Sequence, residues 1–572
     1  MAVFRSFFFL ALQYTLCSGA FISVEDLSKT KFDFIVVGGG TAGNVVANRL
    51  SENPKNSVLL LEAGGSNANV IDVAVPFLAG RASPNTAQDW NYTTSPQAGL
   101  NGRSIPYNRG FGLGGSSSTN FLIYSRGSKE DYDRWATVTG DKSWSWNSLI
   151  PYMRKNEIFG QPTDHHNISG QFDPSVHGFQ GINSVALQGY PTPIDGRIIE
   201  TTTQLAEFPF NLDMNSGNPI GIGWVQGTIK NGTRSSSATS YLAPQFLARP
   251  NLKVLLHARA TRVLQTSAGC VRTVEFSTSV GVLVPPNILL HSGIGNSSTL
   301  KSLSIPLLHN LPSVGQNLSD HSLLFQSNFV VNSTDTFDTD ARNATLGEEE
   351  LAQWNNSRTG LDVDIPVSHL GWLRVPNNSS VFKRFPDPSA GHTAPHFELL
   401  IANGIIGGPP PATGNYMSMV PAVVSPSSRG SVTLRNNDVF ADPIIDPNLL
   451  GTEVDMFIMR EAVKSTFRFT KAAAWKDYVI DSFAISESST DAEIESFIRA
   501  HAGTVYHPAG TASMSPKGAK WGVVDPDLTV KGLKGLRVVD LSITPFIPAT
   551  HTQFTAYVIG EKGSDLIKGA WN

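Results

Sequence analysis

Two short apolar runs near the start of the chain frame a helical pattern. Phe34 to Val37 form the first run and Val58 to Leu61 the second. Between them, Val45, Val46 and Leu50 recur with helical spacing and share one face. Apolar runs of this length suit strands buried on both faces, as in a parallel sheet. The pattern therefore predicts a strand, a helix and a strand over residues 33–62.

Glycines stand where the first strand passes into the helix, in G-x-G-x-x-G spacing, and an acid follows the second strand. Such glycines allow a tight turn and close approach of a pyrophosphate. The helix start offers free N–H groups, and the acid accepts from a ribose hydroxyl. The sequence therefore predicts a dinucleotide site, without separating FAD from NAD. The candidate contacts are Gly38, Gly40, Thr41, Ala42, Gly43 and Glu62.

Length and composition describe a globular protein of more than one domain. The chain has 572 residues, more than one core usually holds. Hydrophobic residues make up 40% and charged residues 16%, with a formal net charge of −4. This charge gives no reason to expect nucleic acid or an anionic membrane surface as a partner. We expect a monomer.

The N-terminal segment predicts a cleaved signal peptide over residues 1–20, and hence secretion. Arg5 precedes an apolar stretch, and small residues follow at Ser18 to Ala20. A buried helix or a membrane anchor is the alternative, but the stretch is short for a span, and no later run is long enough. Cys17 would leave with the signal, so Cys270 would stand alone without a disulfide. Ten N-x-S/T sequons support secretion: Asn91, Asn167, Asn231, Asn296, Asn317, Asn332, Asn343, Asn355, Asn377 and Asn378.

The C-terminal region predicts further pieces of the dinucleotide-binding domain. Leu536 to Val539 read as a strand, followed by Asp540 and a helical pattern over residues 552–567. This domain is therefore expected to be discontinuous, with a substrate domain inserted between about residues 325 and 500. Polar residues 332–356 and the Gly-Pro run 407–411 are expected to be surface loops or a lid.

A second glycine-rich loop and two histidines are candidates for chemistry. The loop covers Arg109 to Ser118 and suits close approach to a cofactor, although an ordinary linker would look alike. His507 and His551 lie in loops rich in Pro, Gly and Thr, where a neutral imidazole is able to take a proton. Loop histidines are usually only solvated. A zinc site lacks its ligand spacing, and a serine hydrolase lacks its G-x-S-x-G elbow.

Taken together, these segments resemble the glucose-methanol-choline (GMC) oxidoreductases over nearly the whole chain after the leader. The matching motifs, besides the glycine fingerprint and His551, are LGGSS at 113–117, SGIG at 292–295, VGQNLSDH at 314–321 and YHPAGTASM at 506–514. The resemblance implies an α/β fold: a discontinuous, Rossmann-like FAD-binding domain and an α+β substrate-binding domain with an antiparallel sheet. It places the FAD domain at 33–150, 220–325 and 500–572, and the substrate domain at 151–219 and 326–499.

Within the family, four segments resemble the secreted aryl-alcohol oxidases of fungi. They are DWNYTT at 89–94, NGRSI at 101–105, RSSSATSYL at 234–242 and WGVVDPDL at 521–528. This implies that a primary aromatic or allylic alcohol gives its proton to His507 and a hydride to flavin N5, with His551 positioning the hydroxyl. It further implies that O₂ is reduced to H₂O₂. Tyr92 would stack on the substrate, and Tyr506 would stand beside the base.

Other outcomes remain open under the same resemblance. A dehydrogenase would use a quinone in place of O₂, a hydroxynitrile lyase would cleave cyanohydrins without redox chemistry, and a third possibility is a protein without activity. The family pattern implies non-covalent FAD, because Asn120 stands near the position where members with covalent flavin carry His, and it implies no metal. The remaining FAD contacts it implies are Gly114, Gly115, Ser116, Asn120, Ala260, Asp540, Thr552 and Gln553.

The chain departs from the family pattern before Pro286. About fifteen residues are missing there, including a strand of the form KEVILSAG, and loss of a buried strand exposes apolar surface of a sheet. Three readings stay open: Val280 to Val284 replace the strand, the chain folds poorly, or the sequence is a mis-spliced gene model.

Overall fold

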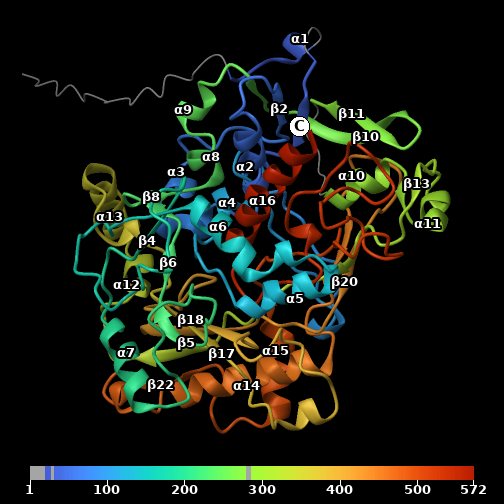
Figure 1. Ribbon diagram of the computed structural model, residues 1–572. Coiled ribbons are helices and arrows are strands. Elements are labelled where there is room, and N and C mark those ends of the chain that lie inside the picture. Colours follow the sequence, from blue (N-terminus) through green and yellow to red (C-terminus); the bar gives the residue numbers. More distant parts are fainter. Residues whose placement is uncertain (1–19, 28–30, 279–284, 572) are drawn as a thin grey trace, which may run out of the picture.

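Two main sheets, a parallel one and a larger antiparallel one, organise the part of the molecule that the structure describes. The computed structural model describes residues 20–27, 31–278 and 285–571, so the expected signal peptide lies almost entirely outside the described residues. In Figure 1, helices α2 (Thr41–Leu50) and α16 (Gln553–Trp571) lie in the upper part, and a broad sheet lies below them. The family-type architecture of an α/β domain and an antiparallel sheet domain is confirmed.

The strand, helix and strand expected at the start of the chain are present. β1 (Phe34–Val37) lies parallel to β2 (Val58–Leu61), which lies parallel to β9 (Leu252–Leu255). Helix α2 connects β1 to β2 and buries its apolar face. The helix expected over residues 552–567 is α16, which packs against α2 so closely that a Cβ at Gly560 would meet Val45 Cβ at 2.8 Å.

Strand β1 has a neighbour on one side only within the described residues. The sheet order there is β1-β2-β9, so β1 is its outermost strand. Ile35 and Val37 on β1 are 38% and 37% exposed, whereas all of β2 is buried. This exposure agrees with the apolar surface expected from a missing strand. Val280 to Val284, named above as a possible replacement, lie outside the described residues.

The strand predicted at Leu536 to Val539 is absent from the described part of the chain, so that prediction is wrong. Arg537 makes only an isolated bridge to Thr529. A parallel strand needs a neighbour to pair its N–H and C=O groups. Because β1 pairs only with β2, these residues have no described edge of the parallel sheet beside them.

The lower sheet is antiparallel and has the order β22-β16-β19-β18-β17-β5, with β15 paired to β19 and β23 paired to β15. Helix α14 (Glu453–Phe469) packs on β18 and β19, and their apolar residues form the largest core. The strands are β5 (Gly221–Trp224), β15 (Ser322–Leu323), β16 (Asn328–Val331), β17 (His369–Leu373), β18 (Phe397–Ala402), β19 (Tyr416–Val423), β22 (Val479–Phe483) and β23 (Gly503–Thr504).

Three of these strands come from segments that the sequence analysis placed in the FAD domain. β5 and β15 lie within 220–325 and pair with β17 and β19, and β23 lies within 500–572 and pairs with β15. The antiparallel sheet therefore gains strands from the flanking segments. The rest of the domain division stays a prediction.

Smaller elements surround the two sheets. Among them are the sheet of β3 (Glu157–Phe159), β4 (Asn183–Leu187) and β6 (Gln226–Gly227), the hairpin of β10 (Arg259–Ser267) and β11 (Cys270–Ser277), and the helices α4 (Ser116–Thr119), α5 (Lys129–Thr139), α6 (Trp146–Asn156), α7 (Asp195–Gln204), α10 (Pro285–His291) and α15 (Asp491–His501).

The segment 332–356, expected to be a surface loop or a lid, is largely helical, so the expectation of a loop is wrong and a lid stays a prediction. Helices α12 (Phe337–Arg342) and α13 (Ala344–Ser357) fill most of it. Asn343 separates them, and its side chain accepts from Leu346 N to cap α13. This N-cap contact gives a polar segment a helix start that its low hydrophobicity did not suggest.

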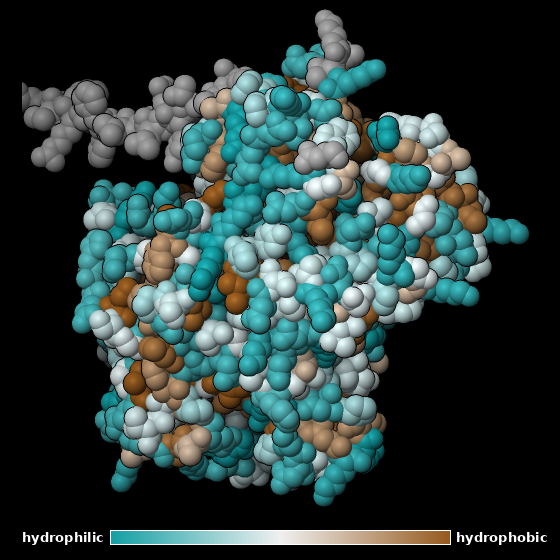
Figure 2. All heavy atoms as spheres, viewed as in Figure 1, coloured by the Kyte–Doolittle hydropathy of each residue, from teal (hydrophilic) through white to brown (hydrophobic). Residues whose placement is uncertain are grey.

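The surface is mixed, with small groups of hydrophobic residues among hydrophilic ones on the face shown in Figure 2. None of the helices in the described part of the chain is long and apolar enough to cross a membrane. Of the ten sequon asparagines, Asn296 and Asn317 are half-buried and the others are exposed. Asn317 donates to Ser513 Oγ and to Pro545 O, so its amide is engaged inside the protein.

Candidate active site

The start of α2 forms a cradle of the kind that holds a pyrophosphate. Its N-cap residue, Gly40, supplies no side chain to the free N–H groups, and a Cβ placed at Gly40 would meet nothing within 4 Å. Gly43 is confined instead, because a Cβ there would lie 1.9 Å from Gly38 O. Thr41 and Ala42 open the helix between them. The uncapped helix end, with open space above it, fits an anionic group.

Glu62 ties the cradle together at the end of β2. Its carboxylate accepts from Gly39 N and from Gly64 N, both at 2.7 Å. Burial raises the pKa of Glu62 above its usual range. The acid therefore lies next to the glycine turn, as a ribose-binding acid would.

The second glycine loop packs on this turn and is not a loose linker. Gly114 N donates to Gly39 O at 2.7 Å. Gly115 has a φ of 50°, and a Cβ there would lie 2.8 Å from Gly40 Cα, so only glycine suits this position. Ser116 begins α4, and its Oγ accepts from Gly110 N at 3.1 Å.

The start of α16 completes the cradle from the other end of the chain. Asn120 Nδ2 donates to Gln553 Oε1 at 2.9 Å, and Thr552 is buried beside it. Asp540 instead accepts from Ser542 N at 2.8 Å and caps a short 3-10 helix. Ala260 is buried in β10. Two helix N-termini and two glycine loops thus come together, and this donor set fits the FAD that the family resemblance implies.

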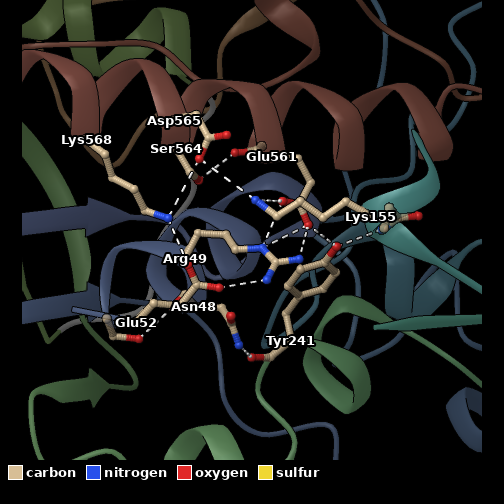
Figure 3. Close-up of polar contacts among 12 residues, drawn as sticks. Asn48, Arg49, Glu52, Lys155, Tyr241, Glu561, Ser564, Asp565 and Lys568 are labelled. Carbon is tan, nitrogen blue, oxygen red and sulfur yellow. Dashed lines mark hydrogen bonds and ion pairs between the residues drawn. The ribbon is translucent and has the colours of Figure 1, made fainter. Parts of the chain in front are cut away.

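A buried ionic network holds α2 against α16 (Figure 3). Arg49 on α2 donates to both carboxylate oxygens of Glu561 on α16, at 2.7 and 2.8 Å. Tyr241 Oη donates to the same carboxylate at 2.6 Å, and Lys155 Nζ lies 3.3 Å from it. Glu561 is fully buried. The two helices whose N-termini form the cradle are therefore fixed to each other by charge as well as by packing.

The two histidines predicted to act in catalysis lie together. The ring centroids of His507 and His551 are 5.1 Å apart, with the rings almost perpendicular. His551 N donates to Ser125 Oγ at 3.0 Å, and His551 Nε2 lies 2.8 Å from Glu398 Oε1. Glu398 is on β18 of the antiparallel sheet and is 1% exposed. The site thus lies between the cofactor cradle and that sheet.

A third histidine, to which the sequence analysis assigned no role, is hydrogen-bonded to His507. His321 Nδ1 lies 3.0 Å from His507 Nδ1, and His321 is fully buried. The neighbouring Asp320 accepts from His507 N at 2.8 Å, from Tyr107 Oη at 2.7 Å and from Thr504 Oγ1 at 2.6 Å. Two residues of the VGQNLSDH segment therefore hold His507: Asp320 binds its backbone N–H, and His321 is hydrogen-bonded to its ring.

Burial sets the protonation of this cluster. It lowers the pKa of His507 well below the usual range, and the nearby His551, His321 and Arg109 act in the same direction. Burial also lowers the pKa of His321 to about 3, with His551 adding to it. Both imidazoles are therefore neutral near neutral pH, the state in which one of them is able to accept a proton.

The two tyrosines predicted to bind substrate have different surroundings. Tyr92 is 2% exposed in a cluster with Tyr107 and Leu318, and its hydroxyl has no partner among the described residues. Tyr506 is half-buried beside His507 in the left-handed conformation, and its carbonyl accepts from Arg109. Substrate contact by either ring stays a prediction.

Sequence reasoning missed Glu398 and the role of His321. Glu398 is a single acid inside an apolar strand, FELLIA, and such an acid carries a signal because unpaired charge is rarely buried. His321 was part of a quoted motif, but its contact with His507 spans 186 residues of sequence. Only the fold brings them together.

Comparison with known proteins agrees with this geometry. The two GMC oxidoreductase family models match residues 32–323 and 426–560. The chain is 41% identical to a pyranose dehydrogenase of Agaricus campestris, over 95% of this chain and 94% of the relative. A solved formate oxidase from Aspergillus oryzae is similar with a TM-score of 0.86 and 28% identity, covering 95% of this chain and 99% of that one.

A fungal aryl-alcohol oxidase structure has a TM-score of 0.77 at 24% identity, covering 94% of this chain and 99% of that one. At this identity the likeness extends to the fold alone. The resemblance to the wider family, expected from the sequence, is confirmed, and the chain belongs to the GMC oxidoreductase family.

Proposed function

We propose that this protein oxidises a carbon-bound hydroxyl group, with His507 as the base that takes the hydroxyl proton. The observation that carries the proposal is the arrangement of the histidines. His507 uses Nδ1 for His321, and this is the one hydrogen bond that its ring makes with the described residues, so Nε2 is left for a substrate. His551 lies beside it at a ring distance of 5.1 Å. A neutral base with one free nitrogen is what proton abstraction requires.

In the proposed reaction the hydroxyl proton passes to His507 Nε2, which makes the adjacent C–H bond a better hydride donor. The residues of the cradle described above would hold FAD, which when bound supplies the acceptor for that hydride. His551, held by Glu398 and Ser125, orients the hydroxyl oxygen. Because burial lowers the pKa of His507, its ring is neutral and does not have to lose a proton before it accepts the hydroxyl proton.

For the substrate we propose a hydroxyl-rich molecule of the sugar class. Glu398 uses carboxylate oxygen Oε1 for His551, and this is the one hydrogen bond that its side chain makes with the described residues. A carboxylate accepts from sugar hydroxyls, and the buried Trp372 beside His551 offers an aromatic wall. The similarity to a pyranose dehydrogenase supports this class.

A primary aromatic alcohol is the second candidate, supported by the four aryl-alcohol-oxidase-like segments of the sequence. For the electron acceptor we propose a quinone, since the relative is named a dehydrogenase, with O₂ as the alternative. We further propose non-covalent FAD, because Asn120 offers an amide that is already engaged with Gln553. Secretion as a glycosylated monomer is also proposed, from the leader and the exposed sequons.

The test starts with the purified protein and its flavin spectrum. Anaerobic mixing with D-glucose is expected to bleach the flavin faster than mixing with p-anisyl alcohol. 1,4-Benzoquinone is expected to restore the colour faster than O₂. Faster bleaching by p-anisyl alcohol would favour the aryl-alcohol oxidase reading, and H₂O₂ on air exposure would favour O₂. No bleaching by either, with cyanohydrin cleavage instead, would overturn the redox proposal. Acid precipitation that leaves flavin in the supernatant checks for non-covalent attachment.

A matched variant tests the base itself. His507→Ala is expected to retain FAD and to lose about 10²–10⁴-fold in the rate of flavin bleaching, the usual contribution of a general base. A variant that bleaches at the parent rate would remove His507 from this role.

A further inference from the structure

The hydrogen bond between His321 and His507 joins the Nδ1 atoms of the two rings, so it constrains which nitrogen of each ring carries a proton. The two Nδ1 atoms are 3.0 Å apart, so one of them carries a proton and the other offers a lone pair. Both imidazoles are neutral because of burial. Each ring therefore has one N–H, and the hydrogen bond couples the choice of nitrogen in one ring to the choice in the other.

The proposed role of His507 as the base separates the two arrangements, because a base needs a lone pair on Nε2. His507 Nδ1 then carries the proton, and His321 Nδ1 accepts it. The other ring nitrogen of His321, Nε2, is fully buried and makes no hydrogen bond within the described residues. A proton on Nε2 leaves His321 Nδ1 as the acceptor.

We propose that His321 is a positioning residue that fixes the tautomer of His507: His321 Nδ1 accepts the Nδ1 proton of His507 and so leaves the lone pair on His507 Nε2. This inference rests on the proposed role of His507 as the base. In the opposite tautomer, Nε2 of His507 would carry the proton and would be unable to take another from a substrate hydroxyl.

The other contacts of His507 in the described residues do not determine which of its ring nitrogens carries the proton. Its backbone N–H goes to Asp320, which fixes the loop but not the ring protons. The carboxylate of Glu398 is bonded to His551 and not to His507. Among the described residues, His321 is therefore the only group hydrogen-bonded to the ring of His507. When His507 gains a second proton, the same hydrogen bond becomes charge-assisted and stabilises the cation.

Two amide substitutions, whose side chains differ by one methylene group, separate this role from simple packing. His321→Asn places an amide oxygen close to the former Nδ1 and keeps the acceptor. His321→Gln places its amide near the former Nε2 and removes it. Magic-angle-spinning ¹⁵N NMR of the FAD-loaded protein, labelled at histidine, reads the tautomer directly, and His507→Ala assigns the signals. The parent and His321→Asn are expected to show a protonated Nδ1 and an unprotonated Nε2 on His507.

His321→Gln is expected to lose this preference. It is also expected to slow flavin bleaching by D-glucose or p-anisyl alcohol, by up to the about 10²–10⁴-fold that a general base contributes, with little change in KM. The inference is overturned if His507 carries its proton on Nε2 in the parent, or if His321→Gln keeps the parent tautomer. These signals need no substrate, so they stand even if no alcohol bleaches the flavin and the proposed function fails. Thermal melting and FAD content of both variants detect misfolding.

Discussion

The imidazole of His507 depends on its surroundings for its chemistry. Burial lowers the pKa of His507, and the nearby His551, His321 and Arg109 lower it further. The ring therefore stays neutral in mild acid, where a free histidine would be charged. Asp320 fixes its backbone, and His321 holds one ring nitrogen. A general base works best when it is neutral and correctly oriented before the substrate arrives. The loop composition around His507 indicated a base, but only these contacts explain how it is prepared.

This environment predicts an unusual pH profile. An unperturbed histidine would be half protonated near pH 6.5, so the rate of flavin bleaching would already fall there. Because burial lowers the pKa of His507, we expect the rate constant to stay level from pH 8 down through 6.5 and to fall only at lower pH. Stopped-flow measurement under anaerobic conditions, with the alcohol that bleaches fastest, checks this. A midpoint at or above pH 6.5 would show that the base is not desolvated in the FAD-loaded enzyme.

Tyr92 leads to a second prediction at the residue scale. Its ring is buried among Tyr107 and Leu318, and its hydroxyl has no partner among the described residues. Tyr92→Phe is therefore expected to leave both stability and rates unchanged. Tyr92→Ala is expected to cost about 3–5 kcal/mol of unfolding free energy, as other aromatic truncations in cores do.

Denaturant unfolding of both Tyr92 variants provides the measurement. If Tyr92 stacks on substrate instead, Tyr92→Ala would keep its stability and lose only about 0.5–1.5 kcal/mol in handling aromatic alcohols. Comparing p-anisyl alcohol with a small aliphatic alcohol separates these outcomes.

At the scale of elements, the sequence predicted those helices and strands that depend on neighbouring residues. Apolar spacing and glycine turns within short segments predicted β1, α2, β2 and α16. The strand at Leu536 to Val539 was not realised, because strand pairing depends on a neighbour that the sequence alone does not guarantee. Helices α12 and α13 were missed because their stretch is polar and their start depends on one capping asparagine.

The buried ionic network between α2 and α16 predicts a large loss of stability when one carboxylate in it is replaced by an amide. Glu561→Gln keeps the shape of the side chain but leaves Arg49 with only Glu52 as a carboxylate partner. Breaking one partner of a buried ion pair typically costs about 3–5 kcal/mol. We expect a lower melting temperature and faster loss of FAD, because both helix N-termini of the cradle depend on this contact.

An exposed pair offers the control. Glu207→Gln removes the partner of Arg468 in a pair in which both side chains are more than 40% exposed. Such surface pairs contribute about 0–1 kcal/mol, so this variant should melt like the parent and keep its FAD. Equal melting temperatures and equal FAD content of the two variants would show that the buried ionic network does not affect the cofactor site.

At the scale of the whole molecule, the site depends on segments far apart in the chain. His321, Glu398, His507 and His551 come from four segments and meet between the cofactor cradle and the antiparallel sheet. The sequence predicted the two domains and both catalytic candidates through motifs. It did not predict that β5, β15 and β23 pair within the lower sheet, because such pairing is fixed by tertiary contacts.

The one-sided pairing of β1 leads to the last prediction. In the described residues β1 is an edge strand, and Ile35 and Val37 on it are more than a third exposed. An added parallel strand would bury these side chains, where full burial of one is worth about 1.5–3 kcal/mol, and would pair the free backbone groups of β1. Insertion of KEVILSAG between Ser279 and Val280, which lie outside the described residues, is therefore expected to raise both the melting temperature and the FAD content. A permuted insert of the same composition, with its apolar residues no longer contiguous, should raise neither. If KEVILSAG changes nothing or lowers both, the edge of β1 does not limit this protein, and the shortened segment is harmless.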